Sequence, residues 1–282
     1  TGGEGHDGGT TFSMGNQLTF TGSGELDNGM TVSLSFIQDE GTATFDNHSV
    51  SVSSDAMGTL VLHGQGGGSA TSAMDATAAG NLWDTFDGVG LATGVTHTNS
   101  APGTNAFMYT LPEIMEGVSL YASYNPQVAG TTEAEVGYGI TYTGIEGLKV
   151  GAAFGDDNTS ATAGLELSNV YATYTMDAFS VGIQASESDS ETANADKDFT
   201  ALGVSYAVSE DMSVSFGQSE LSYENPATAD QEATGISASY TMGSMTLAGT
   251  VNDITNQGSA ATGAGNTTSN NETFEINLSF AF

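Results

Sequence analysis

Apolar and polar residues alternate along most of the chain. At the carboxy end, the apolar series Phe274, Ile276, Leu278, Phe280 and Phe282 is interleaved with Thr273, Glu275, Asn277, Ser279 and Ala281. Side chains of a β-strand point alternately to its two faces, so this pattern predicts a strand with one apolar and one polar face. The pattern recurs throughout the sequence and predicts about fifteen strands. Between the apolar positions the residues are mostly Ser, Thr, Gly and Ala.

Helices that cross a membrane are excluded by the same pattern. The sequence contains no run of roughly eighteen consecutive apolar residues, which a membrane-spanning helix requires. Few windows show the apolar spacing of three and four that marks an amphipathic helix. We therefore expect an all-β chain.

The connections between the predicted strands are alternately short and long. The short ones are residues 27–29, 55–58, 112–117, 143–147, 176–178, 208–211 and 242–245. The long ones, rich in acidic residues, Ser, Thr, Gly and Asn, are residues 38–45, 66–103, 125–132, 156–165, 187–198, 223–231 and 253–270. Antiparallel strands place alternate connections at opposite ends, so the short turns share one rim and the long loops share the other. This arrangement is typical of transmembrane antiparallel β-barrels.

A lipid environment then assigns the two faces of each strand. Only a closed barrel pairs all backbone groups in hydrocarbon, so the apolar positions face lipid and the Ser, Thr and Gly positions enclose a water-filled interior. Tyrosines near strand ends are candidates for the aromatic girdles at the two membrane surfaces. These are Tyr109, Tyr121, Tyr124, Tyr138, Tyr142, Tyr171, Tyr174, Tyr206 and Tyr240; ordinary strand propensity is the alternative explanation.

Composition limits the partners. The 282 residues contain 34 Asp and Glu but only two basic residues, Lys149 and Lys197, which gives a formal charge of −32. Such a chain lacks the cations that a nucleic-acid partner requires. Strong acidity favours a saline medium, where ions screen the self-repulsion. The chain has no cysteine and hence no disulfide or thiolate site.

The order of these elements resembles a known family. An early long connection, residues 66–103, carries Asn81-Leu82-Trp83-Asp84-Thr85-Phe86, a tight turn lies at Asp27-Asn28-Gly29, and the chain ends at Phe282. Together they resemble the general diffusion porins of Gram-negative bacteria, in particular the alphaproteobacterial branch. The resemblance implies a single barrel of about 15–16 strands over residues 1–282, located in the bacterial outer membrane among lipid and lipopolysaccharide. It also implies a homotrimer that passes small hydrophilic solutes and ions and is not an enzyme.

The resemblance also predicts an irregularity at the barrel seam. Phe282 ends at the short-turn rim, whereas the strand that starts at residue 11 begins at the long-loop rim. The family's first strand is thus unaccounted for. We expect a missing or substituted strand between residues 16–21 and the terminal strand, unless the barrel closes with fifteen strands.

Residues 66–103 are the expected pore constriction, since the corresponding loop of the family folds into the lumen. Candidate constriction residues are Asp75, Asp84 and Asp87, with Trp83 placed to pin the loop, and His63 and Gln65 on the wall. Other positions expected to face the lumen are Gln17, Ser33, Ser35, Glu135 and Lys149. The wall carries none of the family's arginines. Carboxylates without compensating bases predict a preference for cations, although the three aspartates could equally be solvated loop residues.

Two further hypotheses concern metal ions and an alternative function. Asp156, Asp157, Asp196 and Asp198 offer oxygen ligands suited to Ca²⁺ in exposed loops, although solvated acidic loops explain them as well. No cofactor is required for passive diffusion. The alternative function is an outer-membrane adhesin or structural barrel with acidic, Ca²⁺-binding surface loops. No nucleophile, base and orienting group come together in the sequence, so catalysis is not expected.

Overall fold

One antiparallel sheet forms the molecule. The computed structural model describes residues 2–4, 18–38, 47–74, 105–126, 134–157, 164–257 and 269–281. In these ranges the sheet has sixteen strands. They are β1 (Gly2–Glu4), β2 (Leu18–Glu25), β3 (Thr31–Gln38), β4 (His48–Ser54), β5 (Gly58–Gln65), β6 (Ala106–Thr110), β7 (Val118–Asn125), β8 (Glu135–Ile145), β9 (Leu148–Asp157), β10 (Leu165–Met176), β11 (Phe179–Ser190), β12 (Lys197–Ala207), β13 (Met212–Tyr223), β14 (Gln231–Met242), β15 (Met245–Gln257) and β16 (Ser269–Phe280), with the 3₁₀ helix η1 (Ser72–Met74) after β5.

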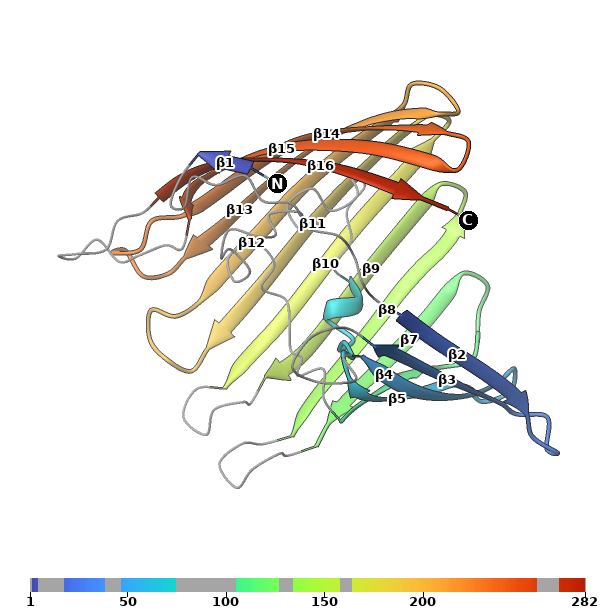
Figure 1. The fold of residues 1–282 in the computed structure, drawn as a ribbon. Coiled ribbons are helices and arrows are strands. Elements are labelled where there is room, and N and C mark those ends of the chain that lie inside the picture. The colour runs from blue at the N-terminus through green and yellow to red at the C-terminus, as the bar shows by residue number, and fades with distance from the viewer. Residues whose placement is uncertain are drawn as a thin grey trace.

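Neighbours in sequence are neighbours in the sheet from β2 to β16. The sheet curls round on itself, with the short turns at one end and the longer connections at the other (Figure 1). The predicted alternation of short and long connections is therefore confirmed by the strand boundaries. None of the helices in the described ranges has the length and apolar character needed to cross a membrane.

The two faces of the sheet have opposite chemistry. Large apolar side chains on the outer face are exposed, including Ile236 at 62% and Ile276 at 68%. Adjacent residues on the inner face are buried, such as Asn252 at 2% and Ala233 at 3%. A water-soluble sheet would bury the first set and expose the second. The outer face therefore suits hydrocarbon, as the alternation predicted.

The seam contains a substitute for the expected first strand. β1 has only three residues and pairs with β16, joining Gly2 to Phe274 and Gly3 to Thr273. With β1 the sheet reaches sixteen strands, within the predicted range of 15–16. The alternation alone did not locate β1 because three residues are too short to show a period of two. Among the described residues, no backbone pairing joins β1 to β2, the two ends of the sheet order.

The predictions for three residues were wrong. Lys197 opens β12 rather than lying in a loop, and its Nζ lies 5.9 Å from the centre of the Tyr223 ring. Tyr121 and Tyr171 are not girdle residues, because both pack on the lumen side near Met74. The sequence pattern misled because β7 and β10 carry aromatic residues on both faces.

The strands differ in height around the sheet. β4 to β7 have five to eight residues each, whereas β8 to β16 have ten to thirteen. A membrane-spanning strand needs about nine to eleven residues. The tall wall, β8 to β16, is thus long enough to cross a bilayer and project beyond it.

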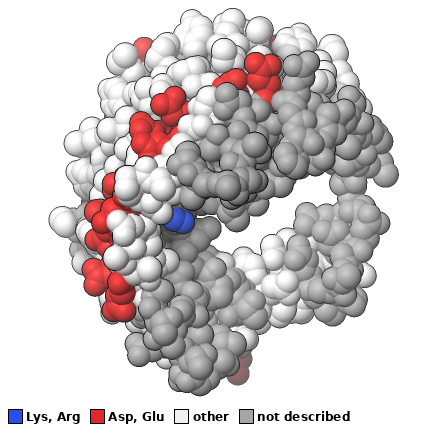
Figure 2. Space-filling model, turned by 90° about the vertical axis from the view of Figure 1, so that its left-hand side faces the viewer, with Lys and Arg blue, Asp and Glu red and all other residues white. Residues whose placement is uncertain are grey.

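Carboxylates form a belt around the outer face of the tall wall, close to the long loops. The belt consists of the exposed residues Asp156, Glu166, Glu187, Asp189, Asp198, Glu220, Glu232, Asp253 and Glu272. Several stand directly opposite one another across neighbouring strands: Glu166 faces both Asp156 and Asp189. Figure 2 shows acidic side chains along the outer margin of this end of the molecule. Like charges in directly opposed positions destabilise a sheet.

Replacing Glu166 by Gln should therefore stabilise the folded barrel at low salt, by a few tenths of a kcal/mol for each relieved pair. The gain should disappear at about 1 M salt, where the Debye length falls to about 3 Å. Unfolding of the detergent-solubilised protein, followed by circular dichroism at both salt concentrations, measures it. Glu146→Gln, in a short turn at the other rim, is the control. A salt-independent gain in Glu166→Gln would contradict the explanation.

Candidate channel and constriction

The chain turns into the barrel directly after β5. Gly66 has a φ of 74°, a left-handed conformation that favours glycine. The next residues lead to an inserted segment, residues 69–74, whose Ser69, Ala70, Thr71 and Met74 are all buried. Helix η1 within it contacts β9 and β10. The described start of the long connection thus lies against the inner wall.

Two hydrogen bonds fix the backbone of the inserted segment to this wall. The amide of Ala70 donates to Ser123 Oγ on β7 at 2.9 Å, and Asn169 Nδ2 on β10 donates to the carbonyl of Thr71 at 3.3 Å. Asn169 is itself held by Ser186, whose hydroxyl donates to Asn169 Oδ1 at 3.0 Å. The first anchor pairs the buried amide of Ala70, and the second gives the carbonyl of Thr71 a donor in addition to the amide of Met74.

Apolar contacts complete the attachment. Met74 is buried with Ala153 and Tyr171, and Tyr121 packs against this cluster. The wall beneath Met74 has glycine at two positions where a side chain would be too close. A Cβ atom added at Gly139 would lie 3.2 Å from Met74 Cε, and one added at Gly151 would lie 2.8 Å from Met74 Sδ. Glycine at these positions lets another backbone approach closely. The inner wall of β7 to β10 is therefore shaped to receive this segment.

The remaining inner wall carries hydroxyl groups that pair with one another. Ser213 and Ser239 hydroxyls lie 2.7 Å apart, and Ser215 and Ser237 hydroxyls 2.8 Å apart. The pair Thr241 and Thr246 continues the ladder at 3.0 Å. These side chains are exposed or half-buried on the short-turn half of the wall. A passage bounded by uncharged hydroxyls favours water and hydrophilic solutes over apolar ones.

The predicted site residues are placed as follows. Asp75, Trp83, Asp84, Asp87 and Gln17 lie outside the described residues. Ser33 pairs with Ser23 and Ser51, and Ser35 with Thr21 and Ser49, on the small-residue face. His63 packs beneath Gly67 at the start of the inward turn. Gln65 ends β5 opposite His48, after a register shift.

Glu135 and Lys149 occupy different levels of the wall. Glu135 is buried near the long-loop end of β8, where its Oε2 accepts a hydrogen bond of 3.4 Å from Asn125 Nδ2. Lys149 lies near the opposite end of β9, is exposed, and shares the face of Gly151 and Ala153. The structure therefore does not bring these two charges together.

Several residues of the site were not predicted, namely Ser123, Asn169, Met74 and the glycines of the wall. A signal was present in the sequence. The neighbouring strands β8 and β9 carry two lumen-facing glycines each, namely Gly137, Gly139, Gly151 and Gly155, whereas β11 to β14 carry one each. A cluster of glycines on one face of paired strands marks a close backbone approach.

The candidate Ca²⁺ ligands come from separate parts of the sheet. Asp156 and Asp157 end β9, while Asp198 lies on β12 and Asp196 accepts a hydrogen bond of 2.8 Å from the amide of Ser190. Asp156 borders a depression of about 330 Å³ with Glu166, Asp189 and Glu191. Within the described ranges, no three His, Cys, Asp or Glu side chains are arranged to hold a metal ion. We therefore make no metal proposal.

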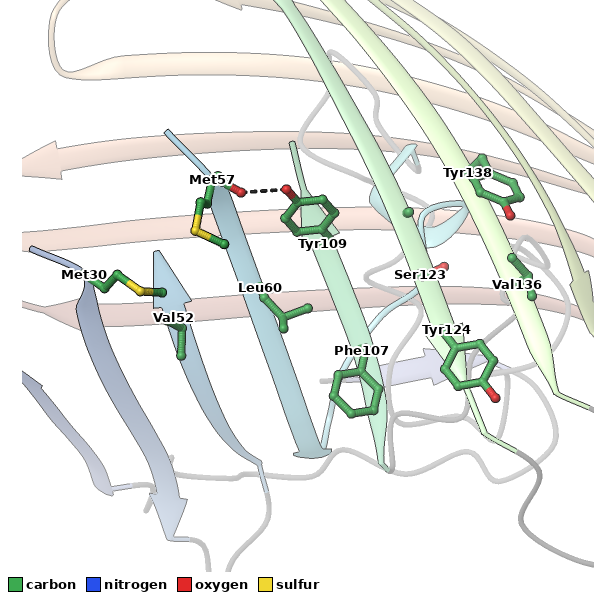
Figure 3. Close-up of a pocket in the computed structure, with 12 residues that line it drawn as sticks. Met30, Val52, Met57, Leu60, Phe107, Tyr109, Ser123, Tyr124, Val136 and Tyr138 are labelled. Atoms are coloured by element: carbon green, nitrogen blue, oxygen red, sulfur yellow. Dashed lines mark hydrogen bonds between the residues drawn. The ribbon is translucent and has the colours of Figure 1, made fainter. Parts of the chain in front are cut away.

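An apolar groove of about 700 Å³ lies on the outer face of β4 to β8. Its lining includes Val52, Leu60, Phe107, Tyr109, Ala122 and Tyr138. Tyr109 crosses to the turn before β5, where its hydroxyl donates to the carbonyl of Met57 at 2.6 Å (Figure 3). The groove is hollow because small Ala122 stands among large aromatic neighbours. It extends across most of the short-stranded wall.

Comparison with known proteins identifies the family. The family model described as Gram-negative porin matches residues 1–223. The chain belongs to the Gram-negative porin family. This porin is similar in fold to the anion-selective porin from Comamonas acidovorans, with a TM-score of 0.69, 14% identity, and coverage of 97% of this chain and 91% of that one. No curated protein matches its sequence.

Two further solved structures show the same fold. A porin refined at 1.8 Å resolution has a TM-score of 0.69 at 17% identity, with coverage of 94% of this chain and 92% of that one. A mutant form of the Rh. blastica porin has a TM-score of 0.64 at 18% identity, with coverage of 94% of this chain and 89% of that one. These likenesses support the transmembrane barrel predicted from the alternating pattern.

Family membership settles the general role. The protein is a porin of the bacterial outer membrane and forms a channel rather than an enzyme. The family requires no cofactor. The matches give no support to the alternative of an adhesin or structural barrel. A neighbour described as anion-selective shows that this fold does not by itself fix the sign of selectivity.

Removing an anchor of the inserted segment should loosen it. Asn169→Ala deletes the side-chain bond to Thr71, worth about 1 kcal/mol, without touching the outer face. We expect a broader distribution of single-channel conductance and more current noise in planar bilayers. Ser215→Ala breaks a hydroxyl pair remote from the segment and is the control. Identical distributions for Asn169→Ala and the unmodified porin would contradict this attachment.

Proposed function

We propose that residues 1–282 form a single porin barrel that serves as a passive, non-specific diffusion channel for small hydrophilic solutes and ions, with residues 66–103 as the constriction. The observation that carries the proposal is the inserted segment on the inner wall of β7 to β10. A segment fixed there narrows the passage, so solute size decides which molecules cross. The hydroxyl ladder on the facing strands supports passage of hydrophilic solutes.

A preference for cations is the second part of this proposal. The chain offers Asp75, Asp84 and Asp87 in the proposed constriction, with Trp83 as its aromatic anchor. The wall positions proposed to face them are Gln17, Ser33, Ser35, His63 and Gln65, of which none carries a permanent positive charge. Carboxylates without compensating bases raise the local concentration of cations.

Reversal potentials across a bilayer in a salt gradient test the preference. The unmodified porin should favour K⁺ over Cl⁻, and the double substitution Asp84→Asn and Asp87→Asn should lower the permeability ratio by roughly twofold or more, because two fixed charges are removed from the narrow region. Asp55→Asn, in a short turn at the rim, should leave the ratio unchanged. A preference for Cl⁻ in the unmodified porin would refute this part.

We propose that the porin is a homotrimer whose subunits meet through the short wall, β2 to β7, while the tall wall faces outer-membrane lipid and lipopolysaccharide. Two observations support this division. β4 to β7 are below the length that spans a bilayer alone, and the groove at Leu60 and Ala122 offers an apolar concavity for a neighbouring subunit. The tall wall instead presents a continuous apolar face below the carboxylate belt.

A charge in the groove should disrupt the trimer. Leu60→Lys should shift the detergent-solubilised protein from trimer to monomer, because an unpaired ammonium cannot be buried between apolar subunits. Native mass spectrometry reads the oligomeric state directly. Ile236→Lys places the same charge on the tall wall, where Ile236 is 62% exposed, and should leave the trimer intact. A trimer unaffected by Leu60→Lys would place the subunit contact elsewhere.

A further inference from the structure

Lys149 places a positive charge on the inner wall of a very acidic protein. It lies on β9 with its side chain exposed, on the same face as Gly151 and Ala153, which meet the inserted segment. The other basic residue, Lys197, begins β12 at the long-loop end. Of the two lysines, Lys149 is therefore the one that lies between the inserted segment and the short turns.

Strand register fixes the level of Lys149 along the passage. It stands opposite Thr173 on β10 and two residues from Gly151, over which Met74 is seated. Two residues of strand correspond to roughly 7 Å. Lys149 thus lies immediately beyond the described end of the inserted segment, where a solute that has passed this segment meets the wall.

Within the described part of the chain, the surroundings of Lys149 orient its charge without neutralising it. Its Nζ lies 5.6 Å from the centre of the Tyr171 ring, which is itself buried. An aromatic face attracts a cation but leaves its charge and its N–H donors available. Among the described residues, the ammonium has no carboxylate partner, and the cross-strand neighbour is the neutral Thr173. The buried lumen carboxylate Glu135 lies at the far end of the adjacent strand.

We propose that Lys149 determines how well anions cross this porin: its ammonium attracts chloride, carboxylate and phosphate groups beside the inserted segment and limits the cation preference. This inference rests on the proposed diffusion function. A fixed charge in a narrow passage bounded by low-dielectric walls concentrates ions of opposite sign. An effect of about twofold on the anion permeability is expected at low salt for one unit charge acting across about 8 Å of water.

The absence of cysteine from the chain permits a direct test. Lys149→Cys provides a single thiol at this position. In planar bilayers, the K⁺ to Cl⁻ permeability ratio from reversal potentials should rise by about twofold in Lys149→Cys relative to the unmodified porin. A methanethiosulfonate reagent carrying trimethylammonium should restore the original ratio, and one carrying sulfonate should raise it further. The matched control is Lys197→Cys with the same reagents, for which we expect the smaller change.

The sign of the added charge separates the proposal from a structural role of Lys149. A side chain needed only for packing would respond to both reagents in the same direction. The inference is overturned if Lys149→Cys conducts normally and its permeability ratio is unmoved by either reagent. If the unmodified porin forms no ion-conducting channel, the proposed function itself fails. The two failures are therefore distinguishable in one set of recordings.

Discussion

Backbone hydrogen bonding in a medium without water is the constraint from which the rest of this structure follows. A strand in hydrocarbon must pair on both sides, because an unpaired amide or carbonyl there costs several kcal/mol. In one sheet of sixteen strands, each strand from β3 to β16 pairs with the strand before it in sequence, so every strand between the two ends of the sheet order, β1 and β2, has a partner on both sides. Period-two side chains then give one face to lipid and the other to the interior. The small residues of the inner face, such as Ser215 and Gly151, leave room for a passage and for a segment inside it.

The inserted segment lies against the inner wall of this sheet. The chain turns inward at Gly66, and Ser123 and Asn169 bind the backbone of the segment. The wall beneath it has glycine at positions 139 and 151, where a side chain would collide with Met74. These hydrogen bonds matter because a segment that moved freely would not give the pore a fixed width. Charge is distributed in a complementary way: many carboxylates stand on the outer face near the long loops, while the inner wall near the segment carries the cation of Lys149.

The sequence predicted those features that repeat. Alternation such as that of Phe274 to Phe280 located the strands and their outer faces, and the short and long connections gave the order of the sheet. What it did not predict depends on single contacts between distant parts of the chain. β1 is too short to alternate, and the inward positions of Tyr121 and Tyr171 become visible only when Met74 is placed beside them. The sequence around Asn169 and Ser123 does not distinguish them from other polar strand residues, so their hydrogen bonds to the inserted segment could not be predicted.

Permeation of neutral solutes tests the account most directly, because it asks whether the interior is a wet passage narrowed by a fixed segment. Liposomes containing the purified porin can be diluted into isotonic solutions of sugars of increasing size, and their swelling followed by light scattering. The account predicts rapid swelling with the smallest sugars and a steep decline with solute size. Vesicles that do not swell with any sugar, at a protein content where the barrel is folded and inserted, would contradict it.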